Sequence, residues 1–381
     1  MYTQTTPNAQ EYTPIKGAVT IREASLDDYA GISSLWSRYG LAPKSCAEWA
    51  HLWTGNPVYK FVRGWPIGWV IELDNAIGGY IGNIPLSYEY QGRHILAAAS
   101  YRLVVDHRYR NYSLPLVSRF FGQSNASLLL NTGVNAQAEA AYRIFRAAQV
   151  PVGTWNRAIY WITDYRGFAA RALVAKKVPM PRAMSIPLGA AMFLRDSLRK
   201  RLPKSHSQGY TVHSNDHFDE RFDTFWDELT LENRGKLLAT RSRAILDWHF
   251  KYHLASGTAS LATVEQNSRL LAYAVFCQEN SRSFGLTRLR LIDVQVLNNR
   301  TELLAPLLAW GLEKCRKERI HMLEAIGFAH SKQDVLGTLA PHRRDLGSWL
   351  YFYKAEDSTL AKDLTDPGIW DPSCFDGESS L

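Results

Sequence analysis

The chain has 381 residues, of which 46% are apolar and 21% charged, and a formal net charge of +8 at pH 7. Because this length is more than twice that of an ordinary domain, we expect two domains, each with its own core. The composition is that of a globular protein and excludes a disordered or fibrous one. The positive charge favours an anionic partner, such as a phosphorylated cofactor, an anionic membrane surface or nucleic acid, without choosing among them.

The four cysteines lie far apart and form no pattern of metal ligands: Cys46, Cys277, Cys315 and Cys374. Neither a zinc site nor a disulfide framework is therefore expected. The first residues lack the basic start and apolar centre of a secretion signal. No apolar run approaches the roughly 18 residues that span a bilayer. We expect a cytoplasmic protein with reduced thiols, no metal and no transmembrane segment.

The first ordered elements are a strand, a helix and three more strands. Residues 19–24 predict the strand, and Ser25 followed by Asp28 predicts the capping box of a helix that ends at Gly40. The three further strands, joined by tight turns, are expected to be antiparallel neighbours: residues 69–73, 78–90 and 94–105.

Helices and strands then alternate. A helix that places Leu114, Val117 and Phe121 on one face is followed by a strand at 126–133 and by a second helix at 135–149. This order implies a parallel strand pair with a right-handed crossover.

The second half repeats the order of the first, which predicts an internal duplication of one fold. Its expected elements are a helix at 217–230, a hairpin turning at 267–268, a strand at 289–297, a helix at 301–318 and a strand at 321–328. We predict a flexible tail at 1–16, an N-terminal domain at 17–190, a basic linker at 191–212, a C-terminal domain at 213–356 and a tail at 357–381.

Two segments have an alternative interpretation. Residues 192–204 combine apolar and basic side chains, so a membrane-surface helix is the alternative to a solvated linker helix. Residues 241–253 mix basic and aromatic side chains as a nucleic-acid surface does. Core packing of Ile245, Trp248 and Phe250 is the preferred interpretation there, and no nucleic-acid partner is expected.

The stretch VVDHRYRNYSLPLVSRFF, residues 104–121, leads from a strand through a charged turn directly into a helix. The first N–H groups of a helix have no partner within it and carry partial positive charge. With Arg108 and Arg110 beside them, these groups suit a pyrophosphate. Dinucleotides and coenzyme A both carry this group. Neither the glycine pattern of a dinucleotide-binding fold nor a Walker loop is present.

The same residues resemble the central motif of the GNAT superfamily of acyl-CoA N-acyltransferases. Val105, Tyr109 and Arg110 match the family pattern, whereas Ser113 and Pro115 stand where the family has glycines. Proline removes one N–H donor, although that donor has no helical partner in a first turn. Downstream, the family pattern Asn-x-x-Ala-x-x-x-Tyr is matched by Asn135, Ala138 and Tyr142.

This resemblance implies a mixed α/β fold of two tandem GNAT-like domains, each with a splay between two parallel strands. The second domain keeps no such motif and is expected to be degenerate. The resemblance also implies that Asn135 contacts the pantetheine arm of acetyl-CoA, or another acyl-CoA, and that Tyr142 protonates the departing thiolate. The residues expected to bind the cofactor are Leu103, Val105, Arg110, Asn111, Tyr112, Ser113, Leu114 and Asn135.

The function implied is transfer of an acyl group, acetyl above all, to a small-molecule amine by direct attack. An amino sugar of a bacterial surface glycan is one such acceptor. The thioester oxygen would be held by a backbone N–H near Val105. Glu72, Glu89 and Asp106 are candidate bases, and none is preferred.

Three alternatives stay open. Tyr142 shares an apolar stripe with alanines and Phe145, so a core tyrosine is as consistent with the sequence as a catalytic acid. Tandem halves also occur in tRNA-dependent Fem-type aminoacyl transferases. The missing glycines permit a non-enzymatic scaffold that has lost the cofactor. The oligomeric state is left open.

Overall fold

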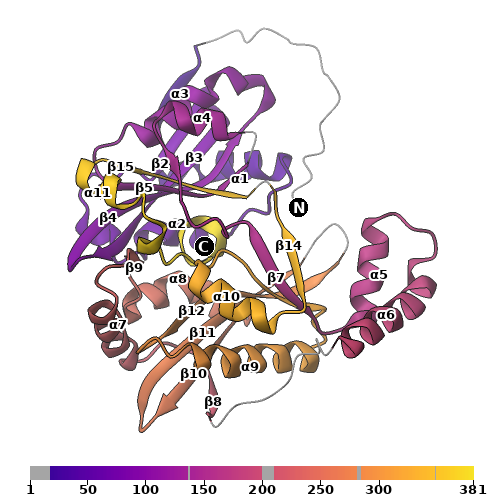
Figure 1. Ribbon diagram of the computed structural model, residues 1–381. Helices are drawn as coiled ribbons and strands as arrows, with labels where there is room; N and C mark the ends of the chain where they lie inside the picture. The colour runs from indigo at the N-terminus through magenta and orange to yellow at the C-terminus, as the bar shows by residue number, and fades with distance from the viewer. Residues whose placement is uncertain (1–17, 136–137, 200–209, 281–284, 348) are drawn as a thin grey trace.

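The computed structural model describes residues 18–381 except 136–137, 200–209, 281–284 and 348. Two mixed sheets form the body (Figure 1). The first sheet has the order β1-β2-β3-β4-β5-β15-β6, with β9 paired to β3. Its strands are β1 Thr20–Glu23, β2 Gly68–Leu73, β3 Ala76–Tyr90, β4 Arg93–Val105, β5 Leu128–Val134, β6 Ala148–Gln149, β9 Leu238–Ala239 and β15 Leu350–Ala355.

The second sheet has the order β14-β7-β13-β12-β11-β10-β8. Its strands are β7 Arg157–Ile162, β8 Val212–Asn215, β10 Ala259–Gln266, β11 Arg269–Asn280, β12 Thr287–Val296, β13 Met322–Ala325 and β14 His342–Asp345. Each sheet contains one parallel pair, β4 with β5 and β12 with β13, and both pairs follow antiparallel neighbours. The predicted mixed α/β fold is confirmed.

The two halves exchange strands. β7, from the first half of the sequence, pairs antiparallel with β13 in the second sheet. β15, from the second half, pairs antiparallel with β5 in the first sheet. The predicted domain limits at 190 and 213 therefore do not separate the two sheets. Strand periodicity in a sequence does not say which sheet a strand joins.

Helices cover the sheets and connect their strands (Figure 1). The α-helices are α1 Tyr29–Arg38, α2 Cys46–Thr54, α3 Ser113–Phe121, α4 Glu139–Ile144, α5 Tyr165–Ala175, α6 Pro181–Leu198, α7 Arg221–Glu232, α8 Arg243–Ala255, α9 Leu304–Lys317, α10 His330–Leu339 and α11 Ser358–Asp363. The short 3-10 helices include η1 Leu26–Asp28, η3 His107–Tyr112 and η7 Gly377–Ser380. Among the described residues, none of the helices has the length and apolar character to cross a bilayer.

Several local predictions are confirmed. The Ser25 and Asp28 capping box is present, and Asp74, Asn75 and Gln91 adopt the positive φ that tight hairpin turns require. Two differ. Leu114 is 44% exposed and does not share the buried face of α3. The helix expected at 135–149 is described only as the six-residue α4, followed by the short strand β6.

The two regions expected to be loose are also partly structured. The predicted linker 191–212 begins as the last turns of α6, residues 200–209 lie outside the described residues, and β8 begins at Val212. The predicted tail 357–381 includes α11 and a segment, Trp370–Leu381, that is largely buried. Figure 1 places the end of this segment between the two sheets.

The largest core cluster draws on both halves of the chain. It joins buried side chains of the first sheet, such as Tyr80 and Tyr88, with residues of α7, α8 and the last segment, such as Phe222, Phe250 and Phe375. A smaller cluster lies on the other face of the second sheet under α9. The burial of Ile245, Trp248 and Phe250 confirms that 241–253 is a core helix face. The halves thus share one interior.

Candidate active site

The parallel strands β4 and β5 diverge. Their register pairs only Ala97–Ala99 with Leu128–Leu130, whereas β4 continues to Val105 and β5 to Val134. Beyond Ala99 the backbone N–H and C=O groups of the two strands therefore no longer pair with each other. This opening is the splay that the sequence predicted between the parallel strands.

A β-bulge in β4 lies at this point. Arg102 has φ 47°, and the register with β3 shifts between Tyr80 and Gly82. The Arg102 guanidinium donates to the carbonyl oxygen of Ala42 at 2.7 Å and lies 4.8 Å from the ring centre of Trp36. A positive φ is energetically unfavourable for any residue other than glycine, so Arg102 keeps this backbone conformation only because its surroundings hold it there. The anchored bulge fixes the direction of the Arg102 N–H.

The acceptor of this N–H comes from the far end of the sequence. Arg102 N donates to Oε2 of Glu378 at 2.6 Å, and Glu378 N donates to Oγ1 of Thr132 on β5 at 3.3 Å. A Cβ atom on Gly133 would lie only 2.7 Å from Oε1 of Glu378. Because η7 contacts both β4 and β5, the Glu378 carboxylate lies in the splay. Burial raises its pKa.

Tyr142, the predicted acid, is buried above β5. Its hydroxyl oxygen accepts a hydrogen bond from Nδ2 of Asn131 at 2.6 Å, and its ring packs against Phe121 and Phe352. Burial raises the pKa of the phenol, and the charge of Glu378 adds to the rise. The phenol is therefore protonated at pH 7. The geometry accommodates a catalytic acid and a core tyrosine alike.

The predicted phosphate cradle has a different local structure from the open turn expected. Residues 107–112 form η3, which runs directly into α3. The His107 N–H donates to the Tyr39 hydroxyl at 2.8 Å, and the Arg108 and Tyr109 N–H groups donate to Asp106 at 3.1 and 2.8 Å. Pro115 has no N–H. Most amides of the turn thus already have acceptors in the chain, which leaves side chains to hold a phosphate.

The predicted cofactor residues lie at or just after the carboxyl ends of β4 and β5, in η3 and at the start of α3. Leu103, Arg110, Asn111, Leu114 and Asn135 are exposed. Val105, Tyr112 and Ser113 are half-buried. Arg108 is held by Asp106, whose carboxylate lies 3.2 Å from its guanidinium.

Of the three candidate bases, two lie away from the splay, and Asp106, which directly follows β4, is engaged by Arg108. Glu72 binds Arg22 at 2.6 Å beside the edge strand β1, and Glu89 lies at the distal end of β3. Asp106 caps η3 and binds Arg108. Sequence reasoning missed Glu378 because it considered only carboxylates on or near the predicted central strands. Trp370 and Phe375, large apolar residues so near the end of the sequence, were the signal that this segment is buried.

In the second half, the corresponding position holds an ion pair. The register between β11 and β12 shifts between Val275 and Phe276 of β11, which marks a bulge in β12. Beside this bulge, Val275 pairs with Asp293 of β12, whose side chain is buried. Arg241 binds the Asp293 carboxylate at 2.8 Å, and both side chains are fully buried. The Tyr273 hydroxyl donates to the same carboxylate. The shared bulge supports a duplication, and the ion pair supports the prediction that this half is degenerate.

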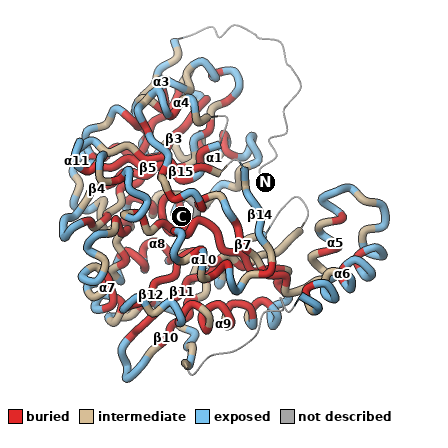
Figure 2. Tube along the Cα trace, in the orientation of Figure 1, coloured by how far each residue is buried: buried red, intermediate tan, exposed pale blue. Residues whose placement is uncertain are grey.

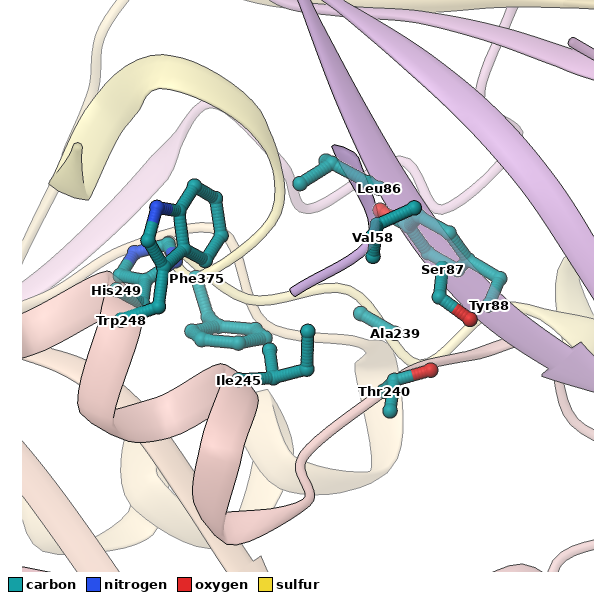
Figure 3. A pocket seen from close by; sticks show the side chains of 10 residues that line it. All are labelled: Val58, Leu86, Ser87, Tyr88, Ala239, Thr240, Ile245, Trp248, His249 and Phe375. Atoms are coloured by element: carbon teal, nitrogen blue, oxygen red, sulfur yellow. The ribbon is translucent and has the colours of Figure 1, made fainter. Parts of the chain in front are cut away.

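A narrow pocket lies elsewhere, between β3 and α8 (Figure 3). It encloses about 280 Å³ including its opening to solvent and is too tight for more than about one water molecule. Its lining is mostly apolar: Val58, Leu86, Ser87, Tyr88, Ala239, Thr240, Ile245, Trp248, His249 and Phe375. The bulge of β4 lies opposite Tyr80 and Gly82 of β3, whereas the pocket is lined by Leu86–Tyr88, farther along the same strand. The pocket is therefore distinct from the splay.

No protein-family model and no curated protein sequence matches the chain. The fold does match solved structures. A GCN5-related N-acetyltransferase from Anabaena variabilis ATCC 29413 is 13% identical with a TM-score of 0.52, and the match covers 89% of this chain and 73% of that one. An N-myristoyltransferase from Saccharomyces cerevisiae, solved with bound myristoyl-CoA and inhibitors, is 10% identical with a TM-score of 0.58, covering 91% and 82%.

A conserved protein of unknown function from Enterococcus faecalis V583, described as a probable N-acyltransferase, is 10% identical with a TM-score of 0.54, covering 89% of this chain and 73% of that one. At such identities the likeness concerns the fold. The chain therefore has the fold of the GNAT superfamily of acyl-CoA N-acyltransferases, with two mixed sheets of this kind in one chain.

Proposed function

We propose that the protein is an acyl-CoA-dependent N-acyltransferase whose site is the splay of the first sheet. The observation that carries the proposal is the Arg102 bulge, which directs a backbone N–H into the opening between β4 and β5. A fixed N–H donor is what a developing thioester oxyanion requires. The N-myristoyltransferase of similar fold was solved with an acyl-CoA, which supports the same class of donor here.

The proposed reaction is direct. A neutral amine attacks the thioester carbonyl carbon, a C–N bond forms, and the C–S bond breaks as the thiolate leaves. Tyr142 gives its proton to the thiolate, and Glu378 accepts the proton that the amine loses. The raised pKa of Glu378 makes its carboxylate a stronger base, which suits a proton acceptor, and the Tyr142 phenol is protonated at pH 7 and so has a proton to give.

Glu378 also controls the oxyanion donor. Its carboxylate holds the Arg102 N–H in the absence of ligand, so an arriving thioester oxygen replaces it there. The displaced carboxylate remains in the splay, next to the carbon under attack. Acetyl-CoA is the donor proposed first, and the acceptor is a small-molecule amine such as an amino sugar. Arg110 and Asn111 are the side chains proposed to meet the pyrophosphate.

Ligand-dependent stability tests the proposal. Coenzyme A at about 100 times its dissociation constant should stabilise the fold by roughly 2.7 kcal/mol, measured as a raised melting temperature. Arg110→Ala should weaken this response with little change in the melting temperature of the free protein, since Arg110 is exposed. Absence of any shift with coenzyme A, acetyl-CoA and longer acyl-CoAs would contradict the proposal.

A non-enzymatic scaffold is the second candidate, favoured by one observation. The Arg102 N–H and the amides of His107, Arg108 and Tyr109 have acceptors within the chain, as in a site that no longer meets a cofactor. Thiol release from acyl-CoA in the presence of an amine mixture separates the two candidates. The tRNA-dependent alternative is separated in the same assay by replacing the acyl-CoA with charged tRNA.

A further inference from the structure

The helical hairpin α5–α6 stands apart from both sheets, at the right of Figure 1. α5 spans Tyr165–Ala175 and α6 spans Pro181–Leu198. Asp196 anchors the base of the hairpin, since its carboxylate accepts from the Tyr165 hydroxyl at 3.0 Å and lies 2.8 Å from Nε2 of His342 on β14. The rest of α6 is mostly exposed (Figure 2).

The polarity of α6 is the reverse of that of an ordinary surface helix. The side it buries carries small or polar residues, namely Ser185, Gly189 and Asp196. Gly189 is needed there because a Cβ atom would lie 3.0 Å from the backbone of α5. The exposed sides carry large apolar residues instead, such as Phe193 and Leu198, which are 49% and 75% exposed.

Exposed apolar residues are concentrated in this hairpin. The described part of the chain exposes sixteen large apolar side chains, and eight of them lie between residues 174 and 198. They are Val174, Met180, Met184, Ile186, Leu188, Phe193, Leu194 and Leu198. Isolated exposed apolar residues need no explanation, but a cluster of this kind marks an interaction surface.

The same hairpin is strongly basic. Residues 164–199 contain seven Lys or Arg side chains and two Asp, and one of the two is the buried Asp196. Lys176, Lys177 and Arg182 flank the exposed Met180 at the tip that joins the two helices. Interfacial elements combine apolar side chains that enter the acyl boundary with cations that meet anionic headgroups.

We propose that the α5–α6 hairpin docks the protein on an anionic phospholipid surface, with its apolar side chains in the interface and its cations against the headgroups. A second copy of the chain is a poor occupant, because two hairpins that met face to face would bring like charges together. The proposal stands independently of acyl transfer. It extends the weaker sequence interpretation of 192–204 to the whole hairpin, including the tip.

Sedimentation with vesicles tests the proposal on the full chain. Binding to phosphatidylcholine vesicles that contain 30% phosphatidylglycerol should exceed binding to pure phosphatidylcholine at least tenfold and should weaken as salt rises. A triple variant of exposed apolar residues, Phe193→Ser with Leu194→Ser and Leu198→Ser, should lose this binding. So should the charge variant Lys176→Glu with Lys177→Glu and Arg182→Glu.

The controls change exposed residues of the same kinds outside the hairpin. Phe61→Ser with Leu231→Ser, and separately Arg63→Glu with Arg93→Glu, should bind vesicles as the unmodified chain does. Equal loss in hairpin and control variants would overturn the proposal. It would also be overturned if the unmodified chain failed to bind the anionic vesicles, or if the triple variant only converted a dimer to a monomer in light scattering.

Discussion

The backbone N–H of Arg102 donates to the carboxylate of Glu378 at 2.6 Å, although 276 residues separate the two in the sequence. The contact joins the strained bulge of β4 to the last segment of the chain. Any ligand that uses the Arg102 N–H must first replace Glu378. Ligand entry at this site is therefore coupled to the position of η7.

Replacing Glu378 tests its role as the proton acceptor. Glu378→Gln keeps an oxygen that can accept from Arg102 N but cannot take up a proton, so turnover should fall roughly a hundredfold while affinity for coenzyme A changes little. If the proposed function holds, kcat/KM of the unmodified protein should fall with decreasing pH at a pH above the usual glutamate range, because the pKa of Glu378 is raised. That acid limb should be lost in Glu378→Gln.

Glu378→Ala distinguishes a Glu378 that accepts a proton from a Glu378 that only blocks the Arg102 N–H. If the carboxylate serves as the base, Glu378→Ala should lose turnover as Glu378→Gln does. Faster turnover in both variants, with tighter coenzyme A binding, would show instead that the carboxylate only blocks the donor.

Gly133→Ala should displace Glu378 without removing it. The added Cβ would lie 2.7 Å from Oε1 of Glu378, closer than such atoms pack, and Gly133 lies on a strand without positive φ. Turnover should fall at least tenfold. Gly235→Ala is the matched control, because nothing lies within 4 Å of the new methyl group. Equal activity of the two variants would argue against a role for the carboxylate position.

Tyr142→Phe should lower turnover and leave coenzyme A affinity nearly unchanged. Loss of the hydroxyl also leaves Nδ2 of Asn131 without this acceptor, which should cost about 1 kcal/mol of stability. Tyr90→Phe is a control, since its hydroxyl is likewise hydrogen-bonded, at 3.2 Å to Asp363, but far along β3. If Tyr142→Phe loses stability alone, measured by urea unfolding, the tyrosine is a core residue.

His249 predicts a pH dependence of stability. Burial lowers the pKa of His249 from 6.5 to about 3. Below pH 6.5 this histidine is protonated in the unfolded chain but stays neutral in the folded chain, so the free energy of unfolding decreases as pH falls. Between pH 7 and pH 5 this loss is about 2 kcal/mol. His249→Gln should abolish it, as measured by urea unfolding at the two pH values.

Because Asp376 also titrates, the contribution of His249 is obtained by comparing the pH dependence of stability in the unmodified chain and in His249→Gln. The pKa of Asp376 is raised to about 6 by burial, so its protonation favours the folded chain as pH falls, opposite in sign to His249. Subtracting the pH response of His249→Gln from that of the unmodified chain removes the Asp376 contribution. His94→Gln, at a side chain that is 81% exposed, should change nothing. A His249→Gln variant with the unmodified pH response would contradict the prediction.

Features that depend on neighbouring residues were predictable from the sequence. The turn at Asp74 and Asn75 follows from side chains that tolerate positive φ, and the capping box at Ser25 follows from the spacing of two side chains. The parallel pair of β4 and β5 follows from the alternation of strand and helix. These predictions needed no knowledge of distant partners.

Features that depend on distant residues were not predictable. The amide of His107 is satisfied by the Tyr39 hydroxyl, so the turn before α3 offers fewer donors than its sequence indicates. Glu378 enters the splay because the last segment packs between the sheets, and no local pattern places an isolated glutamate there. Likewise, no local pattern shows that β7 pairs with β13, a strand from the other half of the sequence.

The reciprocal exchange of β7 and β15 makes the two halves mutually dependent. A fragment cut near residue 205 would lack β15, leaving β5 with an open edge, while the complementary fragment would lack β7 and expose β13. Neither piece contains all the strands of a sheet, so we expect neither fragment to fold alone. Two such fragments, supplied together, would complete each other by strand addition.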